Sequence, residues 1–277
     1  MPEEIALDDL RKWIGKSETE TDVITPELVR RFCATLTGYL PLGNDMPLGL
    51  HWCLALPALP QEALGPDGHP ATGGFLPLML GRRRMWAGSR VDFHNAFVMD
   101  TLITRTSMIA DVVIKKGATS GSLIFVTVRH QFAQAGTLCV EELQTIVYRH
   151  PSLFKSAQPA PACAAIKTQT ITPNSTLMFR YSAITFNGHR IHYDHNYTTQ
   201  VEGYPGLVVH GPLTATLLMN LAQSSRQNDT LRTFEFRGIA PAFVDHALTL
   251  SVLQNDATEL DARNQDGALV MTAKAAF

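Results

Sequence analysis

Side chains that can transfer protons are most concentrated between residues 179 and 197. This segment, FRYSAITFNGHRIHYDHNY, holds three His, one Asp, two Asn and three Tyr. Imidazole suits acid–base catalysis at neutral pH because its unperturbed pKa is about 6.5. Loops carry binding and catalytic residues more often than the elements that they connect. The segment therefore predicts an acid–base site, with a solvated polar loop as the alternative.

Further along the chain, a turn precedes an apolar helix. Residues 206–213 read GLVVHGPL, and Pro212 suits the first position of a helix. The first amides of a helix have no acceptor inside it, so they are available to an anion. We predict that Gly211 opens such a site, with plain helix initiation as the alternative. The leucines that follow fall on one stripe at helical spacing: Leu213, Leu217, Leu218 and Leu221.

The elements that must position these residues are predicted to follow the same order in both halves of the chain. In the first half, Thr25 can cap a helix whose apolar positions recur at Leu28, Phe32 and Leu36. Residues 41–90 are rich in Gly and Pro and indicate loops. Strand-like runs follow at 101–114, 122–132 and 137–148.

In the second half, a polar segment with a short helix precedes the helix from Pro212, and strands are predicted at 233–237, 247–253 and 268–277. Consecutive strands with short turns pair as antiparallel sheets. A helix followed by strands in each half predicts an α+β structural duplication. Residues 151–165, PSLFKSAQPAPACAA, lack periodicity and are predicted to link a domain of residues 1–150 to one of residues 166–277.

Three segments carry a resemblance to a known family. Residues 185–194, TFNGHRIHYD, resemble the hydroxyacyl-thioester dehydratase type 2 group within the MaoC-like, or R-specific enoyl-CoA hydratase, superfamily. The turn GLVVHGPL is similar to the superfamily's HG turn before its central helix. Residues 84–93, RMWAGSRVDF, are similar to the first domain of the same branch. The resemblance covers residues 80–277 and is looser before them.

The resemblance implies a double hotdog, an α+β fold in which two antiparallel sheets each wrap around one long helix. It implies that water is added to, or removed from, a carbon–carbon double bond of an acyl thioester. No cofactor is implied, because coenzyme A is part of the substrate. The chain is therefore expected to be a hydro-lyase whose partner is an acyl-CoA, and its oligomeric state is open between monomer and homo-oligomer.

Alignment with the superfamily's Asp-x-Asn-Pro-Ile-His segment implies roles for individual residues. His192 matches the catalytic His and is expected to activate water. Gly211 is expected to donate its amide to the developing enolate oxygen, which is worth about 3–4 kcal/mol in related sites. His210, directly before it, is expected to bind substrate. Asn187 stands where the superfamily has its catalytic Asp.

Asn187 leaves the identity of the second acid–base group open. An amide cannot exchange a proton, so Asn187 is expected to hold the attacking water. Either His192 performs both proton transfers or another acid joins it. Asp194 is the nearest carboxylate, and in an extended segment its side chain would share a face with His192. The alternative for Asp194 is a structural role in a turn.

Within the branch, the chain most resembles bacterial members that act on short branched dicarboxylyl-CoA substrates. Hydration of itaconyl-CoA or mesaconyl-CoA to citramalyl-CoA, as in itaconate degradation, is therefore expected. The second carboxylate of such a substrate needs a cation, because an unpaired buried charge costs several kcal/mol. Arg190 is predicted to bind it, with a structural role as the alternative. The basic run 82–84 either meets coenzyme A phosphates or is solvated.

Three other functions stand as alternatives. A 3-hydroxyacyl-thioester dehydratase for linear chains would share these motifs, and the sequence does not measure the acyl pocket. A non-catalytic acyl-CoA binding module would share the fold, with Asn187 marking lost activity. Residues 190–195 nearly spell the His-x-His-x-Asp-His run of a metallohydrolase, but Arg190 cannot bind zinc and no metal is expected.

Composition argues against several classes of protein. The 277 residues are 45% hydrophobic with a net charge of −2, unlike a disordered or nucleic-acid-binding chain. No apolar run reaches the roughly 18 residues of a membrane span. Four cysteines without a CxxC pair fit a reducing compartment, and the acidic N-terminus MPEEIALDDL is unlike a signal peptide. We therefore expect a cytoplasmic protein without nucleic-acid or membrane partners.

Overall fold

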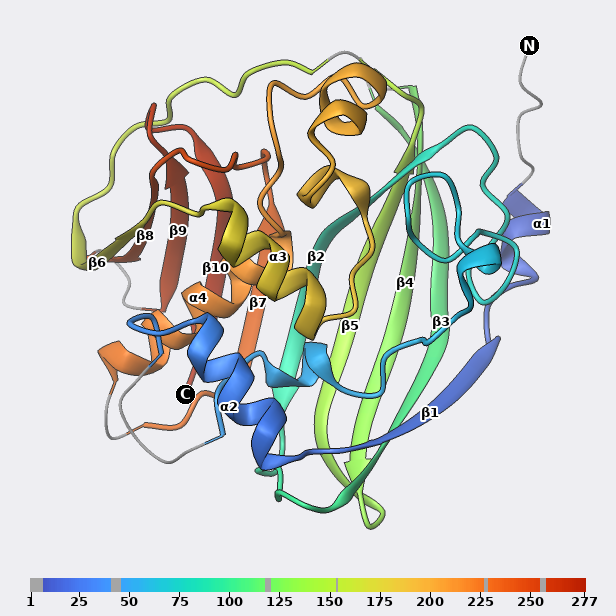
Figure 1. Cartoon of the computed structure of the whole chain (residues 1–277), viewed down its shortest axis with the longest axis horizontal. Coiled ribbons are helices and arrows are strands. Elements are labelled where there is room, and N and C mark those ends of the chain that lie inside the picture. The colour runs from blue at the N-terminus through green and yellow to red at the C-terminus, as the bar shows by residue number, and fades with distance from the viewer. Residues whose placement is uncertain (1–6, 41–45, 118–120, 153, 227–228, 255–257) are drawn as a thin grey trace.

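A single ten-stranded antiparallel sheet forms the frame of the molecule (Figure 1). The computed structural model describes residues 7–40, 46–117, 121–152, 154–226, 229–254 and 258–277. The strand order across the sheet is β1-β3-β4-β5-β2-β7-β10-β9-β8-β6. The strands are β1 (Ser17–Val23), β2 (Arg83–Phe93), β3 (Leu102–Gly117), β4 (Gly121–Gln134), β5 (Thr137–Arg149), β6 (Ala165–Ile171), β7 (Thr233–Gly238), β8 (Leu248–Leu253), β9 (Glu259–Asn264) and β10 (Leu269–Ala276).

The strand order repeats on either side of the sheet's centre, which confirms the predicted duplication. The first five strands follow the order β1-β3-β4-β5-β2, and the last five follow the equivalent order β6-β8-β9-β10-β7. Two separate sheets were expected, but β2 pairs with β7 from Gly88↔Arg237 to Asp92↔Thr233. This pairing joins the halves because each would otherwise leave an unpaired edge strand at the centre. Residues 150–164, between β5 and β6, contain no helix or named strand among those described.

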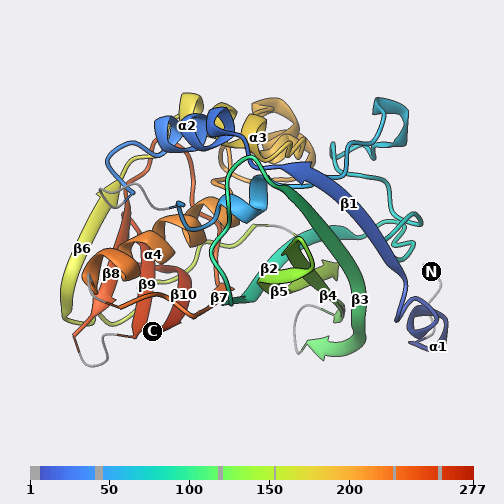
Figure 2. The same cartoon turned by 90° about the horizontal axis from the view of Figure 1, so that it is seen from below.

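Helix α4 (Gly211–Ser225) fills the inner face of the second half. It begins at the predicted turn and carries no charged side chain, and eleven of its residues are buried. A helix that is apolar on all sides belongs in a core. It contacts β7, β8, β9 and β10, and α2 (Pro26–Thr35) and α3 (Ser175–Ile184) lie over its other side (Figure 2).

The first half has no equivalent of α4 among its described residues, and here the prediction of one long central helix in each half is corrected. Helix α2 is capped by Thr25 as predicted, through its Oγ and the amide of Leu28. However, only Phe32 of this helix is buried, and the helix packs against α3. Glu27, Arg30 and Arg31 form exposed ion pairs on α2, so the helix cannot be enclosed by a sheet.

Short elements complete the described chain. The remaining helical segments are α1 (Leu7–Arg11), the 3₁₀ turns η1 (Leu50–Cys53), η2 (Gln61–Ala63) and η3 (Arg190–His192), and the π turn η4 (Tyr197–Val201). None of the helices in the described part of the chain is long and apolar enough to cross a membrane. All four cysteines are free.

Candidate active site

A broad cleft runs along the inner face of the first half and reaches the N-terminus of α4. Its walls come from both halves of the chain, because the first half leaves open the space that α4 fills in the second. The second half contributes Asn187, His189, His192 and Gly211 to the wall. The cleft therefore brings together four residues of the two sequence motifs.

His192 is held in the state that a general base requires. It lies at the end of η3, is 6% exposed and lines the cleft. Its Nδ1 lies 2.7 Å from the carbonyl oxygen of Val208, and a carbonyl only accepts, so Nδ1 carries the proton. Burial lowers the pKa of His192 to about 4. The ring is therefore neutral at physiological pH, and Nε2 keeps a free lone pair.

His210 supports His192 from behind. The two rings stack with centroids 3.6 Å apart, and the Nε2 of His210 lies 2.8 Å from the Oγ of Ser182. His210 is fully buried and does not line the cleft, and burial holds its pKa well below the ordinary value. This placement corrects the predicted substrate contact, because the His210 ring is fully buried and stacks against the His192 ring.

Gly211 opens α4 directly onto the cleft. The amide of Thr214 donates to the carbonyl of His210, and Pro212 has no amide hydrogen. The amide of Gly211 has no acceptor within the helix. Apart from its chain neighbours and the backbone of its own helix, no described protein atom lies within 4 Å of where a Cβ on Gly211 would stand, so the space beside it is open to a ligand. The predicted oxyanion role fits this geometry and stays a prediction.

Asn187 forms the turn that leads into the histidines. Its Oδ1 accepts from the amide of His189 at 2.9 Å, which fixes the side chain in the cleft wall. Among the described residues, Nδ2 of Asn187 makes no hydrogen bond, so this group is available to a bound water. The predicted role of Asn187 as a water-holding residue remains a prediction.

Arg190 and Asp194 are turned away from the cleft, which corrects two predictions. Both predictions required an extended segment, whereas residues 190–192 form a 3₁₀ turn. The Nη2 of Arg190 lies 2.8 Å from Oδ2 of Asp194, and its guanidinium stands over the Tyr197 ring. Asp194 also accepts from the amide of Tyr197 at 2.9 Å. Neither side chain lines the cleft, so the pair holds the loop together.

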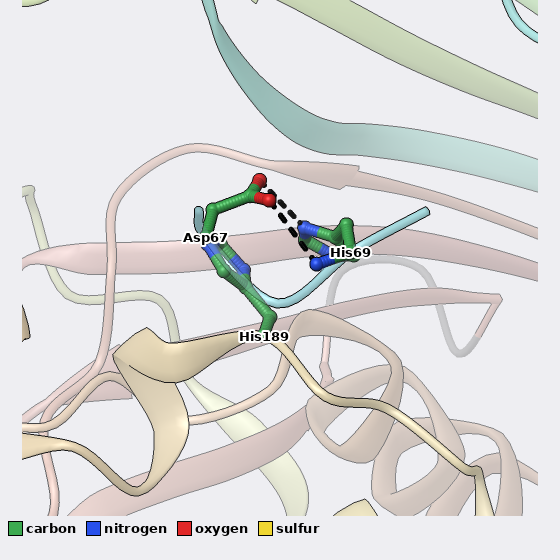
Figure 3. Close-up of side chains that lie close together, drawn as sticks. All are labelled: Asp67, His69 and His189. Carbon is green, nitrogen blue, oxygen red and sulfur yellow. Dashed lines mark hydrogen bonds and ion pairs between the residues drawn. The ribbon is translucent and has the colours of Figure 1, made fainter. Parts of the chain in front are cut away.

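Two residues from the first half, Asp67 and His69, join the site although the sequence analysis missed them. Oδ1 of Asp67 accepts from the amide of His69 at 3.1 Å, and Oδ2 lies 3.0 Å from its Nδ1 (Figure 3). The His69 ring stands 4.1 Å from the ring of His189, which is 5.4 Å from that of His192. A Pro-Asp-Gly turn beside a His was the available signal, but nothing in the sequence places it near residue 189.

Neighbouring charges both raise and lower the pKa values of His69 and His189. Burial lowers the pKa of His69 and of His189, and the positive charge of Arg84 on β2 adds to both effects. Burial alone would raise the pKa of Asp67, but the hydrogen bonds from His69 hold it below its usual value. Asp67 is therefore ionised, and it opposes the loss of the proton from His69.

Asp67, His69 and His189 also have the composition of a metal site. One donor atom from each residue lies within 4.8 Å of the others. However, Nδ1 of His69 and Oδ2 of Asp67 lie 3.0 Å apart, which fits a hydrogen bond in which Nδ1 carries a proton instead of binding a cation. The nearby Arg84 charge also disfavours one. The arrangement is that of an imidazole oriented by a carboxylate.

The fold and the site together define a class of protein. A duplicated antiparallel sheet around a buried helix, with a neutral histidine beside the amide end of that helix, is the frame of a hotdog hydratase or dehydratase. Comparison with known proteins agrees with this class. A family model for hydroxyacyl-thioester dehydratase type 2 matches residues 49–244, and the chain belongs to that family.

Relatives and solved structures extend this result. The chain is 41% identical, over 96% of each chain, to the mesaconyl-C(4)-CoA hydratase of Chloroflexus aurantiacus. The crystal structure of HtdX from Mycobacterium tuberculosis matches with a TM-score of 0.68 at 16% identity, covering 94% of this chain and 98% of that one. A second M. tuberculosis protein, described as a double hotdog, matches with a TM-score of 0.56 at 14% identity, covering 97% and 96%.

These matches confirm the α+β double-hotdog fold and the predicted family. The relatives are hydratases and dehydratases, so the chain is a hydro-lyase. Membership in this family removes the metallohydrolase alternative.

Proposed function

We propose that the protein adds water to the double bond of a short, branched, unsaturated dicarboxylyl-CoA of the mesaconyl or itaconyl kind, giving citramalyl-CoA. The observation that carries the proposal is the neutral His192, whose free nitrogen Nε2 stands in a cleft beside the N-terminus of α4. The 41% identity to a mesaconyl-C(4)-CoA hydratase supports this choice of substrate.

The site residues divide the reaction between them. Nε2 of His192 takes a proton from water as the water oxygen bonds to the β-carbon. The thioester oxygen then gains negative charge, and the amide of Gly211 donates to it. The Nδ2 group of Asn187 holds the water in line. A positioned base of this kind contributes about 10²–10⁴-fold to the rate.

The second carboxylate of the substrate needs a partner in the cleft, and Arg84 replaces Arg190 in this role. Arg84 is half-buried, lines the cleft and donates from Nη2 to the Pro70 carbonyl, one residue after His69. No carboxylate among the described residues forms an ion pair with it. Arg stays charged when partly buried, and its fork matches a carboxylate.

A dehydratase for longer linear chains is the second candidate, and one observation favours it. The cleft continues along the inner face of the first half past apolar side chains such as Phe75, Leu76 and Ile146. A long acyl chain would bury that surface, whereas a C4 or C5 dicarboxylate would leave it to water.

A panel of enoyl-CoA thioesters tests both candidates. We expect mesaconyl-CoA or itaconyl-CoA to give a kcat/KM at least about 10²-fold above that of crotonyl-CoA. Loss of the enoyl-thioester absorbance follows the conjugated substrates, and formation of citramalyl-CoA follows itaconyl-CoA, whose double bond is not conjugated with the thioester. A long-chain 2-enoyl-CoA as the best substrate would establish the second candidate instead. No activity on any thioester would leave an acyl-CoA binding module.

A further inference from the structure

Hydration needs two proton transfers, and the loop that contains His192 supplies no carboxylate to the cleft for the second. Asn187 cannot exchange a proton, and both carboxylate oxygens of Asp194 are engaged outside the cleft. Building on the proposed hydration, we propose that Asp67 and His69 of the first half complete the site. In this arrangement His69 exchanges a proton with the α-carbon of the substrate, and Asp67 is the positioning residue that orients it.

Asp67 fixes the orientation of His69 through two hydrogen bonds. The carboxylate accepts from both the backbone amide and Nδ1 of His69, so the ring cannot turn without losing one of them. The nitrogen that Asp67 leaves unengaged is therefore Nε2. His69 lines the same cleft as His189 and His192, and its ring lies beside that of His189 (Figure 3). A carboxylate that orients an imidazole in this way is a recurrent catalytic arrangement.

The two loops are built to meet at this point. The amide of Arg190 donates to the Asp67 carbonyl at 2.9 Å. Gly68 has a φ of +85°, and a Cβ on it would collide with the Gly188 carbonyl. A Cβ on Gly188 would in turn lie 2.7 Å from the Gly68 carbonyl oxygen, closer than such atoms can approach. The contact therefore needs glycine on both loops. Two surface loops that met by chance would have no such requirement.

The proton count of the reaction closes with these groups alone. An O–H bond of water breaks, its oxygen bonds to the β-carbon, and the proton goes to Nε2 of His192. A C–H bond forms at the α-carbon as the N–H bond at Nε2 of doubly protonated His69 breaks, which leaves the His69 ring neutral. His189, whose ring lies between the two, can then carry the proton from His192 back to His69. Nothing is oxidised or reduced, and no co-reactant is needed.

The surroundings of His69 set the pH dependence of this step. The titratable and charged groups around it are Asp67 on its own loop, Arg84 on β2, Tyr148 on β5, and His189 and His192 from the second half. Burial and Arg84 lower the pKa of His69, and Asp67 raises it. Removing the Asp67 charge must therefore lower that pKa further, which moves the alkaline limb of hydration activity to lower pH.

Variants of this pair test the proposal with the full-length enzyme. We expect His69→Gln to lower kcat/KM by about 10²-fold or more with an unchanged melting temperature. Asp67→Asn should lower it by about tenfold, shift the alkaline limb to lower pH, and lower the pKa of His69 measured by NMR of the imidazole nitrogens. The matched control is His94→Gln, an exposed histidine of the first half outside the cleft, which should behave as the wild type.

A second variant separates catalysis from structure. In the His69→Gln background, Asn187→Asp restores a carboxylate at the position where the superfamily carries one, and we expect it to recover about tenfold in kcat/KM. A purely structural role for His69 would not be rescued in this way. His69→Gln within about threefold of wild-type activity, or no recovery on adding Asn187→Asp, would overturn the proposal.

Two further outcomes are distinct from these. A wild-type enzyme that hydrates no thioester would overturn the proposed function and this inference with it. Stoichiometric zinc that is lost together with activity on chelation, and whose binding His69→Gln abolishes, would replace the acid–base pair by a metal site.

Discussion

His192 is the residue on which the chemistry depends most directly. Because its Nε2 is the free nitrogen in the cleft, His192→Ala should lower kcat by about 10²-fold or more while the fold is kept. The steady-state kcat and the circular dichroism spectrum measure the two effects. A variant with near-normal kcat would remove His192 from the mechanism.

Variants of Arg84 and Arg190 test which arginine binds the second carboxylate of the substrate, with Arg190 as the control. Arg84→Met should raise KM for mesaconyl-CoA by about tenfold or more and barely change KM for crotonyl-CoA, which has no second carboxylate. Arg190→Met should affect both substrates equally, because its partners are Asp194, Tyr197 and the Pro66 carbonyl. Equal losses on both substrates in Arg84→Met would place the selecting cation elsewhere.

The site residues that could be predicted from the sequence are those whose functional neighbours lie close to them in the chain. His192 and Gly211 belong to short motifs, and the structure places both on the cleft wall. Asp67 and His69 meet His189 across about 120 residues of chain, and no local pattern encodes that contact. Arg190 was misplaced because its direction was inferred from an extended backbone, whereas hydrogen bonding closes a 3₁₀ turn there.

At the scale of elements, the N-terminus of α4 is the feature that the reaction uses. Gly211 is not in a left-handed conformation, and the space beside it is open. Gly211→Ala should therefore raise stability slightly, by about 0.4–1 kcal/mol, because it reduces the freedom of the unfolded chain. The same methyl group projects into the space proposed for the thioester, so kcat/KM should fall by about tenfold. Thermal unfolding and steady-state kinetics with mesaconyl-CoA measure these opposite effects, and unchanged kinetics would mean that the thioester does not lie beside Gly211.

Elements with strong local signals were predicted well. The strands expected at 101–114, 122–132 and 137–148 correspond to β3, β4 and β5, and the apolar stripe from Pro212 became α4. Strand β2 was not predicted, because three arginines, one glycine and one serine interrupt the alternation of apolar and polar residues that indicates a strand. The charged side of α2 was the available sign that this helix could not occupy the centre of the first half.

At the scale of the whole molecule, the duplication explains where the site lies. The two halves share a strand order, but only the second keeps a long buried helix among its described residues. The first half therefore contributes an open inner face and the loop with His69, and the second contributes His192 and the helix terminus. The site lies where the halves meet, so neither half alone holds the full set of proposed groups.

Several buried ionisable groups also make the fold sensitive to acid. Burial lowers the pKa of His192 and of His130 to about 4, and that of His51 to about 3. In the unfolded chain each titrates at about 6.5. Glu142 acts in the opposite direction, because burial raises its pKa to about 7. Acid therefore destabilises the fold through these three histidines, and also through His69, His189 and His210, whose pKa values burial lowers, and it stabilises the fold through Glu142.

The balance of these groups predicts how stability changes with pH. Between about pH 6.5 and pH 4 the unfolded chain binds protons at these three histidines and at the other buried ones, which the folded state keeps neutral, while the folded state binds one more proton at Glu142. For His51, His130, His192 and Glu142 alone the net difference approaches two protons, which lowers the free energy of unfolding by up to about 3 kcal/mol for each pH unit, since one proton corresponds to about 1.4 kcal/mol per unit. Urea denaturation at pH 7.5 and pH 5 should therefore give a free energy of unfolding that is lower at pH 5 by a few kcal/mol. His130→Gln removes one of the three histidines and should reduce this difference, whereas the exposed His94→Gln should not. Equal stability at the two pH values would mean that the histidines are protonated in the folded protein, and His192 would then be no base.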